Sequence, residues 1–383
     1  MHDCPDNTEN TDGLDPAEQT RYARHLILPL FGETGQQRLK NARVLFVGAG
    51  GLGCAPALYL AAAGVGTIGL ADDDVVAESN LQRQVLYTTA DIGRPKVEAA
   101  RERLLALNPH IKVLTHPHRL TAANALEVMR AYDVIIDGTD NIPARYLIND
   151  AAFFLKKPWV YAGVHQFEGQ CCVFAPDGPC YRCFFRDPPR PEDMPSCAEA
   201  GVIGVVPGQM GLMQANEVIK LLSGIGEPLT GRLLLYDALE TRLREVRIKP
   251  DPACPLCGAS PSITKLAETA WTCTADDSVP EVSVKEFKVI YDSGQPIFLL
   301  DVREESEHRV ARIERACLIP LGRLAEQLEQ IPRDKPVYCF CKLGGRSAKA
   351  VRLLRENGFD VVISLTGGIR AWSEQIDPDV PVY

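Results

Sequence analysis

The stretch ARVLFVGAGGLG, residues 42–53, decides the fold. Its first half, 42–47, is a short apolar run typical of a buried parallel strand. Its second half is a glycine-rich turn, after which 54–63 is patterned as a helix and 67–71 as a second strand. This is one βαβ unit, and it predicts an α/β fold with a mostly parallel, Rossmann-like sheet covered by helices on both faces.

The alternation of strands and helices continues along most of the chain. Strands are predicted at 113–115, 133–136, 158–163, 170–174 and 233–237, and helices at 96–107 and 209–222. A smaller α/β pattern follows, with strands at 297–302, 337–341 and 361–365 and helices at 321–330, 347–356 and 369–375. We therefore expect a disordered N-terminus at 1–20, a first domain at 21–258, a polar linker at 259–280 and a second domain at 281–383.

Composition narrows the functional classes. The 383 residues carry a net charge of −9 without a basic tract, which argues against nucleic-acid and anionic-membrane partners. Residues 1–20 lack the basic start and apolar core of a signal peptide, and no uninterrupted apolar run spans a bilayer. Thirteen cysteines then favour the reducing cytoplasm, where thiols bind metal or do chemistry.

Four of the cysteines form two CxxC pairs, Cys180 with Cys183 and Cys254 with Cys257. Each pair can bring two thiolates to one ion, and four sulfurs suit a tetrahedral Zn²⁺. The alternative is a set of buried thiols without metal. We expect one structural zinc per chain, with no catalytic part.

The glycine turn at 48–53 predicts a phosphate site, because a helix N-terminus supplies N–H donors and a positive dipole end. Asp72, at the end of the next strand, has the spacing of a ribose-binding acid. These features alone fit an NAD-dependent oxidoreductase. Arg83, Lys96 and Asp140 instead favour a Mg²⁺-nucleoside triphosphate, because a nicotinamide ring does not need them.

Several motifs occur in one order: GAGGLG (48–53), SNLQRQ (79–84), GRPK (93–96), DGTDN (137–141), the CxxC pairs and SCAEAGV (196–202). In these motifs the chain resembles, over 21–258, the E1-like adenylyltransferases of the MoeB/ThiF type. The resemblance implies ATP-dependent adenylation of a small ubiquitin-like sulfur-carrier protein ending in Gly-Gly. The pathway stays open between molybdenum cofactor biosynthesis, thiamine, cysteine, tRNA thiolation and secondary metabolites.

The resemblance also implies roles for single residues. Gly50 and Gly51 would contact the phosphates, and Asp72 the ribose. The residues implied around the triphosphate and its Mg²⁺ are Ser79, Asn80, Arg83, Lys96, Asp140 and Asn141. Arg24 matches an arginine inserted by the other subunit, which implies a homodimer. Cys197 is a candidate for a covalent bond to the carrier, as a thioester or an acyl disulfide.

A second loop, CKLGGRS (341–347), lies between a predicted strand and helix. Its backbone N–H groups form an anion nest, and Lys342 and Arg346 add positive charge, which favours a thiolate or persulfide at Cys341. With DVRE (301–304) and LTGGIRAW (365–372), the loop resembles the rhodanese sulfurtransferases over 281–383. The chain departs from that family at 311–313, where ARI replaces the usual Gly-His-Ile, so we expect His308 to be structural.

Together these features predict an adenylyltransferase and sulfurtransferase that uses ATP, Mg²⁺ and Zn²⁺. An adenylated carrier glycine would accept sulfur from a persulfide on Cys341 and become a thiocarboxylate. The sulfur donor would be a cysteine desulfurase or thiosulfate. The main alternative is a ubiquitin-like activating enzyme that holds its carrier on Cys197 as a thioester for conjugation. A third hypothesis is a non-enzymatic binding module whose active site has lost its function.

Overall fold

The computed structural model describes residues 13–188, 201–268 and 279–382. The described residues fall into two compact units, 13–188 with 201–268 and 279–382. Residues 259–268, within the predicted linker, belong to the first unit, where Ile263 packs beside Cys254 and Leu256. Residues 15–20 also differ from the expected disorder, because Asp15 caps helix α1 (Pro16–Arg21). The α/β class is as predicted in both units.

The first unit is built on an eight-stranded sheet in the order β3-β2-β1-β4-β5-β6-β7-β8. Its strands are β1 (Arg43–Val47), β2 (Thr67–Ala71), β3 (Lys112–His116), β4 (Val134–Asp137), β5 (Trp159–His165), β6 (Glu168–Phe174), β7 (Arg232–Asp237) and β8 (Arg242–Arg247). Neighbours from β3 to β5 pair parallel, and those from β5 to β8 pair antiparallel. β2 and β4 are buried throughout, as continuous apolar runs require.

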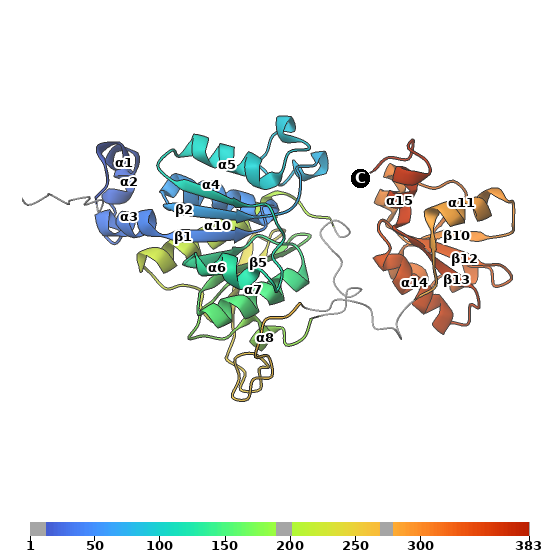
Figure 1. Ribbon diagram of the computed structural model, residues 1–383. Coiled ribbons are helices and arrows are strands. Elements are labelled where there is room, and N and C mark those ends of the chain that lie inside the picture. Colours follow the sequence, from blue (N-terminus) through green and yellow to red (C-terminus); the bar gives the residue numbers. More distant parts are fainter. Residues whose placement is uncertain (1–12, 189–200, 269–278, 383) are drawn as a thin grey trace, which may run out of the picture. The chain divides into compact units, whose positions relative to one another are not determined.

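Helices cover both faces of this sheet (Figure 1). The described helices of the first unit are α1, α2 (Ala23–Leu26), α3 (Gly32–Asn41), α4 (Gly51–Ala63), α5 (Lys96–Leu107), α6 (Ala125–Arg130), α7 (Ile142–Leu155), α8 (Tyr181–Phe184) and α10 (Val205–Ser223), with short 3₁₀ turns at Glu78–Asn80 and Thr89–Asp91. α4 and α5 lie on one side and α6 and α7 on the other, as expected where strand order reverses around β1. α4 begins three residues before its predicted start, inside the glycine turn.

The second unit contains a five-stranded parallel sheet in the order β11-β10-β12-β13-β9. Its strands are β9 (Glu281–Ser283), β10 (Phe298–Asp301), β11 (Cys317–Leu318), β12 (Val337–Phe340) and β13 (Val362–Thr366). Its helices are α11 (Val284–Asp292), α12 (Glu305–Val310), α13 (Leu321–Leu324), α14 (Gly345–Glu356) and α15 (Gly368–Gln375). The prediction of one helix over 321–330 is wrong, because α13 ends at Leu324 and a separate 3₁₀ turn covers Leu328–Gln330.

Two strand ends position the first site. The carboxyl ends of β1 and β4, which are neighbours in the sheet, lead into the glycine turn and the DGTDN segment. In an open α/β sheet, ligands bind at such a switch point. Among the described residues, no helix has both the length and the apolar composition needed to cross a lipid bilayer.

Candidate functional site

The glycine turn between β1 and α4 contains glycines of two kinds. Gly48 has φ +92°, and a Cβ on it would lie 2.7 Å from the Gly138 carbonyl oxygen, so packing demands a glycine there. A Cβ on Gly50 would meet nothing closer than 3.6 Å. Gly50 is the N-cap residue of the 13-residue helix α4. Its missing side chain therefore leaves room for an anion at a helix N-terminus.

The segment 79–87 lies directly over this turn. Its contacts are the Arg83 Cγ, 3.3 Å from the Cβ position of Gly51; the Gln84 Nε2, 3.6 Å from that of Gly50; and the Tyr87 hydroxyl, which donates to the Ala49 carbonyl over 2.8 Å. The Arg83 guanidinium also donates to the Ser79 carbonyl over 3.0 Å. The structure thus brings the SNLQRQ motif to the glycine turn, and adds contacts from Gln84 and Tyr87, to which the sequence assigned no role.

Asp72 and Lys96 flank the same turn. Asp72 accepts hydrogen bonds from the backbone N–H groups of Ala49, over 2.7 Å, and Asp74, over 2.9 Å. Burial raises the pKa of the Asp72 carboxyl in spite of these donors. The Lys96 side chain is almost fully buried and lies 2.8 Å from an Asp74 carboxylate oxygen. A phosphate that binds the Lys96 ammonium would therefore share it with the Asp74 carboxylate or displace that carboxylate. The sequence spacing did not predict this contact between Asp74 and Lys96.

Hydrogen bonds to buried and helix-capping groups hold the DGTDN segment in place. Asp137 is fully buried and accepts from the backbone N–H and hydroxyl of Thr139, over 2.9 and 2.7 Å, and from Arg145 over 3.2 Å. The Asn141 side chain caps α7 by accepting from the Ala144 N–H over 2.9 Å. Asp140 lies between these anchors and is exposed. Asp140 is thus exposed just beyond the carboxyl end of β4, in the segment whose Gly138 contacts Gly48 of the glycine turn.

The predicted metal ligands come together. The Sγ atoms of Cys180, Cys183, Cys254 and Cys257 all lie within 4.8 Å of one another. The Cys183 and Cys257 sulfurs are 3.3 Å apart, and the Cys180 and Cys254 sulfurs 3.5 Å. Burial and the neighbouring thiols raise the pKa of Cys180, because adjacent thiolates repel without a cation. Four convergent sulfurs are the donor set that a tetrahedral, thiophilic divalent ion requires.

A buried ion pair fastens this cysteine cluster to α7. Arg182, between the first two cysteines, donates to both carboxylate oxygens of Asp150, each over 2.8 Å. Its guanidinium also lies 4.6 Å from the ring centre of Tyr146. The Tyr181 N–H donates to the Asn149 side chain over 2.8 Å. These partners were missed, because a separation of 32 residues leaves no local pattern.

Cys341 follows β12 and precedes α14 in the second unit. Its sulfur is buried, accepts from the Gly344 N–H over 3.0 Å and lies 3.7 Å from the Ser347 hydroxyl. The loop therefore does aim a backbone donor at the sulfur. The His308 Nδ1 lies 2.9 Å from a buried Asp301 oxygen that also pairs with Arg303. This contact agrees with the prediction that His308 has a structural role.

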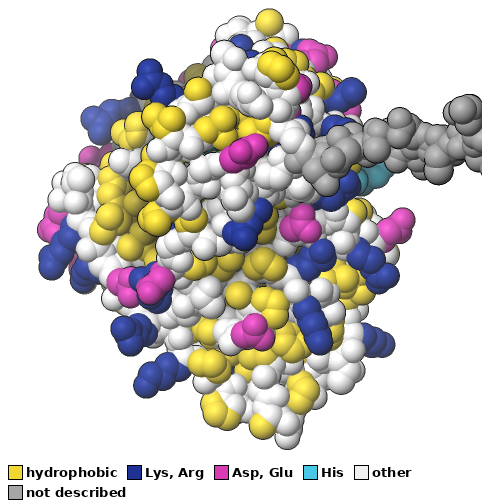
Figure 2. Space-filling model, turned by 90° about the vertical axis from the view of Figure 1, so that its left-hand side faces the viewer, with side chains coloured by type: hydrophobic (Ala, Val, Ile, Leu, Met, Phe, Trp, Pro, Cys, Tyr) yellow, Lys and Arg dark blue, Asp and Glu magenta, His cyan; other side chains and the backbone are white. Residues whose placement is uncertain are grey.

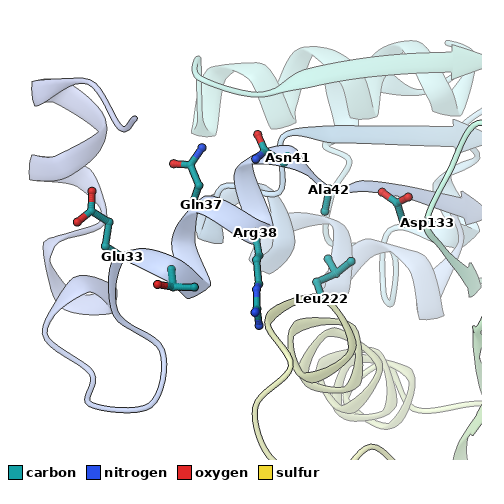
Figure 3. Close-up of a pocket in the computed structure, with 8 residues that line it drawn as sticks. Glu33, Gln37, Arg38, Asn41, Ala42, Asp133 and Leu222 are labelled. Carbon is teal, nitrogen blue, oxygen red and sulfur yellow. The ribbon is translucent and has the colours of Figure 1, made fainter. Parts of the chain in front are cut away.

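Two predicted residues are not brought to a site. Arg24 is exposed on α2, and Cys197 lies outside the described residues. A cavity of about 670 Å³ is lined by Glu33, Thr34, Gln37, Arg38, Asn41, Ala42, Asp133 and Leu222 (Figure 3). It lies where the chain enters β1 and β4, at the opposite ends of these strands from the glycine turn. We therefore do not assign it to the nucleotide.

Comparison with known proteins agrees with this geometry. The model of the ThiF family matches residues 22–256, which include the glycine turn and three of the four clustered cysteines. The chain belongs to the ThiF family. Residues 283–375 match the rhodanese-like domain, which includes the Cys341 loop.

Relatives of this ThiF-family chain share both parts. It is 45% identical to the probable adenylyltransferase/sulfurtransferase MoeZ of Mycobacterium tuberculosis, over 99% of both chains. It is 41% identical to the adenylyltransferase and sulfurtransferase MOCS3 of Mus musculus, over 96% of this chain and 87% of that one. The chain is accordingly an enzyme, an adenylyltransferase and sulfurtransferase.

Solved structures share the fold of the first part. The crystal structure of E. coli MccB superposes with a TM-score of 0.57 at 24% identity, covering 63% of this chain and 73% of that one. The structure of PaaA gives a TM-score of 0.54 at 28% identity, over 64% and 78%.

Proposed function

We propose that this enzyme adenylates the C-terminal glycine of a small ubiquitin-like carrier ending in Gly-Gly and then converts it to a thiocarboxylate. The observation that carries the proposal is the presence, on one chain, of an open phosphate turn edged by Lys96 and Asp140 and of a sulfur cradle around Cys341. The glycine turn with Lys96 and Asp140 suits activation of a carboxylate by ATP, and the loop around Cys341 suits delivery of sulfur. Joining them raises the effective concentration of the second reactant.

The adenylation step needs charge neutralisation. The N-terminus of α4, Arg83 and Lys96 would bind the triphosphate of ATP, and Asp140 would hold Mg²⁺, which supplies further positive charge. The carrier carboxylate attacks the α-phosphorus, the bond to the β-phosphate oxygen breaks, and pyrophosphate leaves. Asp72 would hold the ribose, with Ser79, Asn80 and Asn141 shaping the site.

We propose that the working unit is a homodimer in which Arg24 enters the partner's site. In support, Ile27, Leu28 and Leu30, just beyond Arg24, are large apolar residues that are 73, 49 and 83% exposed. Figure 2 views the side on which α1 to α3 lie, where patches of hydrophobic side chains are interspersed with charges of both signs. Apolar patches of this kind mark contact surfaces.

The sulfur step uses the Cys341 thiolate. It attacks the sulfane sulfur of thiosulfate, and sulfite leaves with the electron pair of the broken S–S bond; a cysteine desulfurase persulfide would serve in the same way. The terminal sulfur of the Cys341 persulfide then attacks the acyl carbon, and AMP leaves. A thiol reductant supplies the two electrons that cleave the resulting acyl disulfide into a carrier thiocarboxylate. A relay through Cys197 would reach the same acyl disulfide in two exchanges: the Cys197 thiolate displaces AMP to form a thioester, and the persulfide then displaces the Cys197 thiolate.

The four clustered cysteines would hold one structural Zn²⁺. We also propose a cytoplasmic setting, where the thiols stay reduced.

A second function is carrier activation for conjugation to proteins, with a thioester on Cys197 as its product. The N–H donor aimed at Cys341 disfavours this as the sole role, because a conjugating enzyme needs no persulfide cradle. The test is to incubate the enzyme with ATP, thiosulfate, a thiol and each candidate carrier, and to weigh the carrier. Replacement of one oxygen by sulfur supports the proposal. A carrier recovered only as a thioester on the enzyme supports the alternative.

A further inference from the structure

Arg346, at the end of the sulfur loop, is bound to another element of the second unit. Its two terminal nitrogens lie 2.6 and 2.7 Å from the two carboxylate oxygens of Glu307, a residue of α12. The side chains of Arg346 and Glu307 are only 16 and 15% exposed. A two-point guanidinium–carboxylate contact fixes orientation as well as distance, which a single ion contact does not.

We propose that Glu307 is a positioning residue for sulfur transfer, which holds Arg346 as a clamp on the Cys341 loop. In this view Arg346 does not supply its positive charge to the sulfur, because Glu307 neutralises it. Stabilisation of the sulfur comes from backbone donors such as the Gly344 N–H, 3.0 Å from Sγ. The inference rests on the proposed sulfurtransferase role of Cys341 and assigns a residue beyond it.

The loop needs such a clamp. Gly344 has φ +125°, a conformation that is open to glycine and that the surrounding structure must maintain. The Ser347 hydroxyl lies 2.9 Å from the Gly344 carbonyl oxygen and 2.8 Å from the Ser364 hydroxyl of β13. The Arg346 contact adds a second anchor, on α12. The turn that presents the N–H group is thus held from two elements.

Glu307 is itself held in place. The Glu304 N–H donates to a Glu307 carboxylate oxygen over 3.0 Å, at the start of α12. The next residue, His308, reaches the buried Asp301 on β10 over 2.9 Å. His308 therefore attaches α12 to β10, next to the residue that binds Arg346. Through Glu307 and Arg346, the sulfur loop is held at a fixed place relative to the sheet.

The test uses the full-length chain and thiosulfate:cyanide sulfur transfer, which needs neither ATP nor carrier. Glu307→Gln keeps the side-chain shape and loses the charge. We expect kcat/KM to fall about tenfold, within the range of coupling between contacting charges. The exchange Glu307→Arg with Arg346→Glu should be more active than Arg346→Glu alone, because it restores an ion pair, although an arginine at position 307 cannot accept the Glu304 N–H. The matched control is Glu305→Gln on the same helix, whose partner Arg323 lies 3.4 Å away at an exposed site; it should leave activity unchanged.

Alkylation of Cys341 gives a second readout, with the Cys341→Ser protein as background. If the clamp orders the N–H donors, Glu307→Gln shifts the pH profile of alkylation to higher pH. A shift to lower pH, or a gain in activity, would mean that Glu307 only masks a useful charge on Arg346. An exchanged pair as inactive as Arg346→Glu alone, or unchanged activity in Glu307→Gln, also overturns the inference. Sulfur transfer by the wild-type chain tests the underlying function separately.

Discussion

Asp137 and Asp140 are three positions apart, but one is buried and the other is exposed, so they suit different roles. Burial raises the pKa of Asp137, and its oxygens are occupied by Thr139 and Arg145. Asp140, on the same turn, is exposed. A cation can reach only the second of these carboxylates without breaking the core, which is why we assign Mg²⁺ to Asp140.

Asp140→Ala should lower carrier-dependent exchange of pyrophosphate into ATP by roughly 10²–10³-fold or more, because the site loses a charge that positions the metal. The measurement is isotope exchange at saturating ATP, with Asp133→Ala, an exposed aspartate that precedes β4, as the control. Near-normal exchange in Asp140→Ala would place the metal elsewhere.

Cys339 and Cys341 lie two residues apart and provide an internal comparison between two buried thiols. Both are buried, but burial raises the pKa of Cys339, and the described structure gives Cys341 a backbone donor. We expect thiosulfate to form a persulfide on Cys341 at pH 8, while Cys339 stays a protonated thiol. Cys339→Ser should keep thiosulfate:cyanide activity and Cys341→Ser should lose it, as read by thiocyanate release. The converse result would refute the assignment.

The cysteine cluster and α7 form the element that ties distant parts of the first unit together. We expect about one zinc per chain by metal analysis. Cys254→Ser, or removal of zinc by a chelator, should lower the melting temperature, because the binding free energy of a structural zinc, on the order of 10 kcal/mol in small zinc domains, contributes to folding. Cys317→Ser, in the second unit, is the control. Freshly purified, reduced protein without zinc would contradict this.

The Arg182–Asp150 pair should matter for the same element. Asp150→Ala leaves a buried guanidinium without its carboxylate and should cost about 3–5 kcal/mol in the free energy of unfolding of the first unit. Replacing both partners by apolar residues should cost less, since no charge is then left unpaired. Denaturant unfolding monitored by the aromatic residues around Tyr181 would measure both; equal costs would show that the ion pair is not the reason.

Elements with clear periodicity were predictable, and elements made by distant contacts were not. β2 and α5 have their predicted bounds, because each combines an apolar pattern with a clear start and end. α7 was missed, since it buries polar residues such as Asn149 and Asp150 whose partners lie on α8. β8 was also missed, because all of its residues are exposed and its pattern shows no buried face. The glycine turn and Cys341 were predictable because motif chemistry is local, whereas Asp74 and Glu307 were not.

The whole molecule is proposed to work as a homodimer, and this has a consequence in mixing experiments. Arg24→Ala and Asp140→Ala should each be inactive in pyrophosphate exchange. Mixed and allowed to exchange subunits, they should recover activity, because one site in a mixed dimer then has both an intact Asp140 and an intact Arg24 from the partner. Absence of recovery, with subunit exchange verified, would show that Arg24 acts within its own chain or not at all.

The central claim is that one chain activates a carrier and also delivers the sulfur. The most direct measurement is the intact mass of a carrier after incubation with ATP, thiosulfate, a thiol and the Cys341→Ala enzyme, beside wild type. We predict normal pyrophosphate exchange by the variant, because adenylation uses the first unit, together with loss of the carrier product in which sulfur replaces oxygen. If Cys341→Ala forms that product from thiosulfate at the wild-type rate, the second unit is not the sulfur source and the account is contradicted.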